Sequence, residues 1–214
     1  MPVELVAKKP RNALPVHLVR KDGLDAALLP PDALAWAKAN GFSGEAGRTL
    51  VLPGKDGTIG GALFGAGEGA LQAGSLARAL PAGDWHFAEP PADPELSALA
   101  LVLGGYVFTR YGKKHGKALR FALPAGVDAD RIGRIAESVF LTRDLVNTPT
   151  SDMGPEALEK AVRALAKKHK ADISVTKGDD LIKKNFPMIH AVGRASAEAP
   201  RLIDLTWGRR AHQK

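Results

Sequence analysis

The chain has 214 residues, of which 45% are apolar and 25% are charged, and its formal net charge is +7 at neutral pH. A chain of this length can bury one generous core or two modest ones, so it is expected to fold as one or two globular domains. The absence of cysteine excludes a disulfide framework and a thiolate metal site, and it favours a cytoplasmic location. The basic residues are spread along the chain, so charge by itself assigns no partner.

A membrane location is not expected. The most apolar stretch, residues 96–108, is about thirteen residues long, whereas a helix that spans a bilayer needs roughly twenty. The N-terminal region carries Lys8, Lys9 and Arg11 but no apolar run of signal-peptide length. We therefore predict neither a membrane span nor an export signal.

Short strands and helices alternate over the first part of the chain. Apolar and β-branched runs predict strands at 14–19, 48–52, 58–64, 85–88 and 118–123. Helices are predicted at 30–39, 68–80 and 96–108, and Gly104-Gly105 in the last of these indicates a close approach to another backbone. This alternation predicts an α/β domain over residues 1–127.

The remainder of the chain is predicted to form a long helix and then the beginning of a second domain. Ile132, Ile135 and Phe140 lie at helical spacing and predict a helix at 128–146, so residues 128–147 would connect the two domains. The second domain, residues 148–214, should contain helices at 155–169 and 179–185 and strands at 173–176 and 201–207. These are the first β/α units of a larger fold.

The glycine-rich run Gly65-Ala66-Gly67-Glu68-Gly69-Ala70 lies between a predicted strand and a predicted helix. A dinucleotide fingerprint would use such a turn for a pyrophosphate, with Asp84 at the distance of a ribose-binding carboxylate. Alanine occupies the third glycine position, however, and Glu68 would place a negative charge where the phosphates should bind. A structural turn is therefore the favoured interpretation.

The sequence supplies no pattern typical of a metal centre or a nucleophile. Its six histidines never fall at i, i+4 with an intervening glutamate, and it contains no Gly-x-Ser-x-Gly. Consequently no catalytic residue and no metal ligand is predicted within this chain.

The densest basic cluster lies between the apolar helix and the strand at 118–123. Its cationic members could contact nucleic-acid phosphates, with Tyr106 and Tyr111 available to stack on bases. A solvated charged loop is the commoner outcome for such a segment. The cluster consists of Arg110, Lys113, Lys114, Lys117 and Arg120.

Three segments of the second half resemble the leucyl (cytosol) aminopeptidase family of dinuclear metallopeptidases. They are DLVNTPTSDMGP at 144–155, NFPMIHAVGRAS at 185–196 and APRLIDLTWG at 199–208. Their order and spacing are similar to those found where the catalytic domain of that family begins. The resemblance implies a variable N-terminal α/β domain, similar to a macro domain, followed by an incomplete peptidase domain.

The same resemblance implies that the parent enzyme is a hexamer that removes N-terminal residues from peptides with two divalent metal ions, zinc, manganese or magnesium. One ion can polarise the scissile carbonyl while the pair lowers the pKa of a bridging water. In the family the ligands lie in a Lys-Gly-x-x-Phe-Asp-x-Gly-Gly segment and an Asn-Thr-Asp-Ala-Glu-Gly-Arg segment. Neither is present here, and the partial imitations at 175–180 and 147–152 lack the defining residues.

Two hypotheses follow from the sequence. The first is that the chain is the N-terminal portion of such an aminopeptidase, inactive by itself, with a role in assembly and active-site access and the rest of the catalytic domain as its partner. The second is a binding module, either for nucleic acid through the basic cluster or for an ADP-ribose-type nucleotide through the glycine-rich turn.

Overall fold

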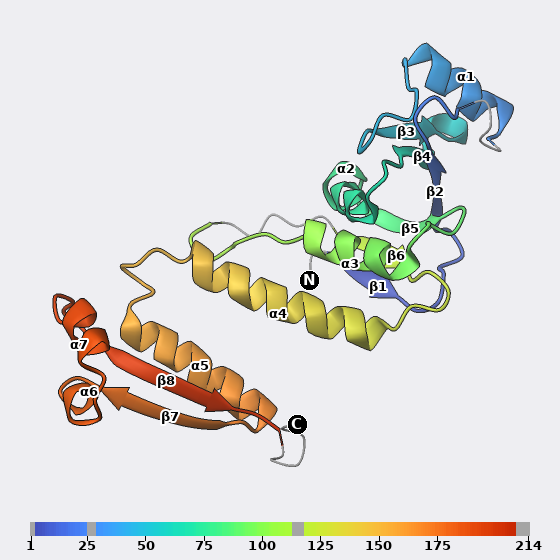
Figure 1. The fold of residues 1–214 in the computed structure, drawn as a ribbon. Helices are drawn as coiled ribbons and strands as arrows, with labels where there is room; N and C mark the ends of the chain where they lie inside the picture. Colours follow the sequence, from blue (N-terminus) through green and yellow to red (C-terminus); the bar gives the residue numbers. More distant parts are fainter. Residues whose placement is uncertain (1–2, 25–28, 113–117, 209–214) are drawn as a thin grey trace. The chain divides into compact units, whose positions relative to one another are not determined.

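The structure is a computed structural model that describes residues 3–24, 29–112 and 118–208 (Figure 1). The chain divides into two compact units, Met1–Arg143 and Asp144–Lys214. Each unit is considered by itself. Among the described residues, no helix combines the length and apolar character needed to cross a membrane.

A six-stranded mixed sheet forms the centre of the first unit. All neighbouring strands are parallel except the last pair, which is antiparallel. The order across the sheet is β1 (Val3–Val6), β6 (Leu119–Ala122), β5 (Gly83–Phe87), β2 (Leu14–Val19), β4 (Ile59–Gly65) and β3 (Thr49–Pro53). The predicted α/β fold is confirmed, because a mainly parallel sheet needs helical crossovers between its strands.

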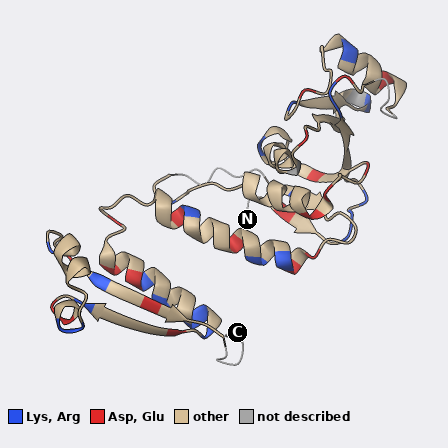
Figure 2. Ribbon diagram, in the orientation of Figure 1, with Lys and Arg blue, Asp and Glu red and all other residues tan. Residues whose placement is uncertain are grey.

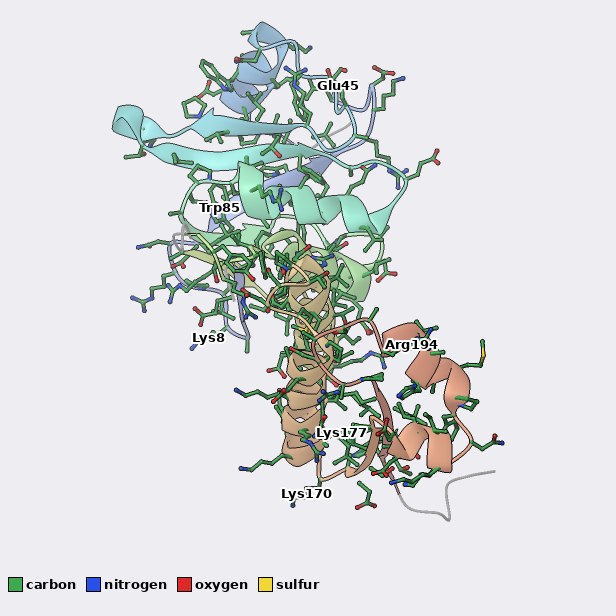
Figure 3. All side chains as sticks on the ribbon, turned by 90° about the vertical axis from the view of Figure 1, so that its left-hand side faces the viewer. Lys8, Glu45, Trp85, Lys170, Lys177 and Arg194 are labelled. Carbon is green, nitrogen blue, oxygen red and sulfur yellow. The ribbon has the colours of Figure 1, made fainter. Side chains whose placement is uncertain are left out.

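Helices cover both faces of this sheet. On one face α2 (Leu76–Ala79) and α3 (Pro94–Gly104) pack on Phe64, Trp85 and Phe121, and Trp85 is completely buried (Figure 3). On the other face α1 (Pro31–Ala39) packs on Val19 and Leu63. Neighbouring residues of one strand point to opposite faces, which is why adjacent positions of β4 serve different clusters.

The apolar helix α3 begins with a defined cap. Asp93 accepts a hydrogen bond from the backbone N–H of Leu96 at 2.9 Å, and Pro94 occupies the first turn, where its missing N–H is not needed. α4 (Ala129–Asn147) packs on α3 through Ile132 and Ala136, which contact Val102. The segment up to Arg143 therefore belongs to the first unit, and the predicted division at 127 and 147 stays a prediction.

The predicted close approach at the glycines of α3 is confirmed. A Cβ added at Gly104 would lie 2.0 Å from the carbonyl oxygen of Gly74. The prediction of one helix over 68–80 is wrong, because Ala70–Ser75 forms a 3-10 segment, η2, before the short α2. Gly69 and Gly74 favour a helix poorly, and the contact with α3 holds this segment in a tighter turn.

The second unit is a helix packed on a two-stranded antiparallel sheet. β7 (Asp172–Lys177) pairs with β8 (Arg201–Thr206), so that Val175 lies opposite Ile203. The helices are α5 (Pro155–His169), α6 (Asp180–Lys183) and α7 (Pro187–Gly193). The sequence predicted all of these elements except α7.

Candidate functional site

The junction between α4 and α5 is held by its own backbone and by one buried hydroxyl. Thr148 is 7% exposed, and its Oγ1 donates to the carbonyl oxygen of Asp144 at 2.6 Å. The backbone N–H groups of Asp152 and Met153 both donate to the carbonyl oxygen of Pro149 at 2.9 Å. The first of the three family-like segments is thus a turn that ends one helix and positions the next.

Glu198 ties the chain before β8 to the start of α5. Its Oε2 accepts a hydrogen bond from the backbone N–H of Glu156 at 2.6 Å. A Cβ at Gly154 would lie 2.8 Å from both carboxylate oxygens, so a larger residue there would displace the Glu198 carboxylate. A carboxylate at a helix N-terminus satisfies otherwise unpaired N–H groups and interacts favourably with the helix dipole.

An ion-pair network joins β8 to α5 farther along the helix. Arg201 Nη1 donates to Glu159 Oε2 at 2.6 Å, and Arg163 Nε donates to Glu159 Oε1 at 2.7 Å. The hydrogen bond from Arg163 and then that from Arg201 lower the pKa of Glu159. The Arg201 side chain is only 6% exposed, so its pair with Glu159 is a nearly buried connection between β8 and α5 and not a pair of solvent-exposed charges.

All three family-like segments converge on one apolar groove of about 640 Å³. Met188 and Val192 of α7 border it and are 75% and 83% exposed. Among the described residues of the second unit, Ala166 and Leu181 are the hydrophobic side chains that are fully buried. The groove is lined by Met153, Gly154, Pro155, Leu158, Met188, Ile189, Val192, Gly193, Pro200, Arg201 and Ile203.

Such an arrangement is unusual for a completed core. A two-stranded sheet is marginally stable by itself, and a large exposed apolar patch marks a surface that contacts further protein. The three segments therefore serve as packing elements around a surface rather than as a collection of reactive groups. No nucleophile or acid–base pair is formed by the side chains described in this groove.

The described residues do not offer a ligand set for the implied metal pair. They contain no group of three or more histidine, aspartate or glutamate side chains that could hold a metal ion. In the imitating segment at 175–180, Gly178 adopts a φ of 57° in the turn after β7, and Asp180 pairs with Lys183 at 2.8 Å. We therefore derive no catalytic step through metal ions from these residues.

A second hollow lies in the first unit, at the carboxyl ends of β2, β4 and β5. It is a cleft of about 1000 Å³. Arg20 and Lys21 line it after β2, the glycine-rich turn lines it after β4, and Glu89 lines it after β5. Sequence analysis missed this cleft, because it identified the turn but not the strand ends that meet beside it.

Glu45 lies in the loop that leads into β3 (Figure 3), and its neighbours Gly44 and Ala46 line the cleft. Hydrogen bonds from its own backbone N–H and from that of Ser43, together with Arg48, lower the pKa of Glu45 to about 2. A Cβ at Gly65 would lie only 1.8 Å from the Glu45 carbonyl oxygen. Close backbone packing therefore explains the first glycine of the turn, as the structural interpretation predicted.

The dinucleotide fingerprint is excluded by the position of Asp84 relative to the glycine-rich turn. Asp84 is near the beginning of β5, whereas the glycine-rich turn follows the end of β4, and both strands run parallel to β2. Arg120 Nε and Nη2 donate to the two carboxylate oxygens of Asp84 at 2.6 Å each, and these bonds lower the pKa of Asp84. Asp84 therefore joins β5 to β6 and is not placed to bind a ribose beside the turn.

The predicted basic cluster is described only in part. Arg120 lies on β6 and is engaged by Asp84, and the guanidinium of Arg110 lies 5.7 Å from the centre of the Tyr111 ring. Lys113, Lys114 and Lys117 lie outside the described residues. Figure 2 shows residues of both signs along α4 and α5. Nucleic-acid contact at the cluster stays a prediction.

Comparison with known proteins relates both units to the same family of aminopeptidases. Residues 14–124 match the M17 aminopeptidase N-terminal domain, and residues 140–214 match the catalytic domain of the cytosol aminopeptidase family. The "Probable cytosol aminopeptidase" of Streptomyces coelicolor is 35% identical over 165 residues, which is 63% of this chain and 32% of that protein. The protein of the same name from Corynebacterium diphtheriae is 31% identical over 200 residues, 82% of this chain and 39% of that protein.

Two solved structures have a similar fold. The cytosol aminopeptidase of Coxiella burnetii has a TM-score of 0.85 and 33% identity, covering 97% of this chain and 47% of that one. The bottromycin maturation enzyme BotP, solved in complex with Mn, has a TM-score of 0.71 at 24% identity, covering 92% of this chain and 45% of that one.

The fold and the converging segments thus correspond to the N-terminal domain and the start of the catalytic domain that this family describes. The chain belongs to the cytosol aminopeptidase family, M17. The aligned part of the chain covers 32% and 39% of the length of these two curated relatives.

Proposed function

We propose that this chain is the N-terminal portion of a cytoplasmic leucyl-type aminopeptidase and that the 214-residue chain does not catalyse by itself. The observation that carries this proposal is the convergence of the three family-like segments on a packing groove.

The apolar groove of the second unit would bind the rest of the catalytic domain. Its apolar lining and the exposure of Met188 and Val192 suit a contact with further protein of the same domain. The match to the catalytic domain over 140–214, and the 47% coverage of the Coxiella burnetii chain, support this occupant. The role of the present residues would then be assembly and control of access to the active site.

The metal pair would belong to the parent enzyme. Two divalent ions, manganese, zinc or magnesium, would polarise the peptide carbonyl and activate a water when bound. The manganese of BotP supports a metal-dependent parent but belongs to that protein. The parent is further proposed to be a hexamer with peptide substrates, and its first unit a macro-like domain, as the family resemblance implied.

A turnover assay tests the proposal. The purified 214-residue chain, supplied separately with Mn²⁺, Zn²⁺ or Mg²⁺, is mixed with a leucyl chromogenic substrate, and release of the chromophore is followed. No release above a metal-only blank is expected. Metal-dependent release that copurifies with the chain would overturn the proposal.

A nucleotide-binding role of the first unit is the second candidate function. The cleft at the strand ends favours it over nucleic-acid binding, because Arg20 and Lys21 line that cleft, whereas Arg120 of the basic cluster is already paired with Asp84.

A further inference from the structure

We propose that the cleft at the carboxyl ends of β2, β4 and β5 binds a nucleoside diphosphate. In this assignment Arg20 and Lys21 contact the diphosphate, and Glu89 and Glu68 accept hydrogen bonds from ribose hydroxyls. This assignment rests on the second candidate function, and it is independent of the peptidase proposal because the site lies entirely in the first unit.

The position of the cleft is the first argument. After β2 the chain passes through α1 and β3 to β4, on one side of β2 in the sheet. After β5 it passes through α3 to β6, on the other side. Because β2 and β5 are neighbours whose connections diverge, a crevice opens beyond their carboxyl ends, and α/β proteins bind ligands at such switch points.

The size of the cleft is the second argument. Its volume of about 1000 Å³ is at the upper end of the range of small-molecule sites, roughly 300–1000 Å³. An inorganic phosphate or a free amino acid would leave most of this space filled with water. A nucleotide with a base, a ribose and two phosphates matches the space better.

The cations supply the third argument. Arg20 and Lys21 follow directly on β2 and are exposed at the cleft. Neither side chain has a hydrogen bond or an ion pair with another residue in the described part of the chain. Guanidinium and ammonium groups bind phosphate oxygens through charge-assisted hydrogen bonds, so two adjacent cations suit a diphosphate.

The carboxylates distinguish a nucleotide from a simple anion. Glu89 Oε1 lies 3.1 Å from His17 Nδ1, which orients the carboxylate at the edge of the cleft. Glu68 lines the cleft from the glycine-rich turn. Both would repel a bare phosphate, but carboxylates are the usual acceptors for ribose hydroxyls in nucleotide-binding α/β folds.

The glycine-rich turn leaves open space beside the cleft at Gly69. The Gly67 N–H donates to Gln72 Oε1 at 3.0 Å, which fixes the turn and leaves the amide hydrogens of Gln72 available as donors. A Cβ at Gly69 would have no heavy atom within 4 Å, although Gly69 lines the cleft. A large side chain at Gly69 would therefore occupy ligand space without straining the backbone.

Isothermal titration of the 214-residue chain with ADP, ADP-ribose and pyrophosphate tests the proposal. Saturable binding of ADP and ADP-ribose is expected, with pyrophosphate binding more weakly. Replacing Arg20→Ala and Lys21→Ala together should weaken ADP binding about tenfold or more, because charge-assisted bonds are lost. Lys8→Ala combined with Arg11→Ala, outside the cleft, is the matched charge control and should bind as the unmodified chain does.

A steric pair completes the test. Gly69→Phe should abolish ADP binding, whereas Gly112→Phe, at another glycine with open space around its Cβ position, should leave it unchanged. Circular dichroism checks that both variants fold. Absence of ADP binding at millimolar concentration, undiminished binding by Gly69→Phe, or pyrophosphate binding as tight as ADP would each overturn the assignment.

Discussion

Replacing Gly104→Ala should destabilise the first unit through a single methyl group. The added Cβ would lie 2.0, 2.6 and 2.8 Å from the oxygen, carbonyl carbon and Cα of Gly74. All three are backbone atoms, so no side chain can rotate away and α3 must move relative to η2. Overpacking of this kind costs about 1–3 kcal/mol.

This loss of stability can be measured as a decrease in melting temperature. For a protein of this size, 1 kcal/mol corresponds to roughly 2–4 °C. Gly133→Ala on α4 is the control, because its Cβ would have no heavy atom within 4 Å and alanine favours a helix by about 0.5–1 kcal/mol over glycine. Thermal and urea unfolding followed by circular dichroism compare the two. A Gly104→Ala variant as stable as Gly133→Ala would refute the close-approach argument.

Two further predictions concern charged groups. Because the folded pKa of Glu45 is about 2 against an ordinary 4.5, its contribution to stability is full above pH 4.5 and is lost as the pH falls towards 2; Glu45→Gln should remove this component from urea midpoints measured between those values. Glu159→Gln should lower the melting temperature of the second unit more than Asp180→Asn, because Arg201 is almost buried whereas the Asp180–Lys183 pair is exposed. Equal melting temperatures for these two variants would contradict the connecting role of Glu159.

Local signals predicted much of the fold. Proline at the start of α1 predicted where that helix begins, and the apolar runs predicted the strands. Gly104 predicted a close contact between two backbones. The strand β1 was not predicted, because four residues beside a basic segment carry little periodicity. The short α7 was missed for the same reason, since seven residues barely complete two helical turns.

The sites depended on contacts that local patterns do not encode. Asp84 and Arg120 are 36 residues apart and meet only because β5 pairs with β6 in one register. The cleft likewise requires three strand ends that are distant in sequence. By contrast, the family-like segments could be identified from sequence, and the structure adds that they pack together around one groove.

The metal content of the purified chain tests the central claim most directly. The 214-residue chain would be incubated with Mn²⁺ or Zn²⁺, dialysed against metal-free buffer, and analysed by mass spectrometry of its metals. The account predicts that no stoichiometric metal is retained. Two divalent ions retained per chain, lost together with any aminopeptidase activity on chelation, would contradict it.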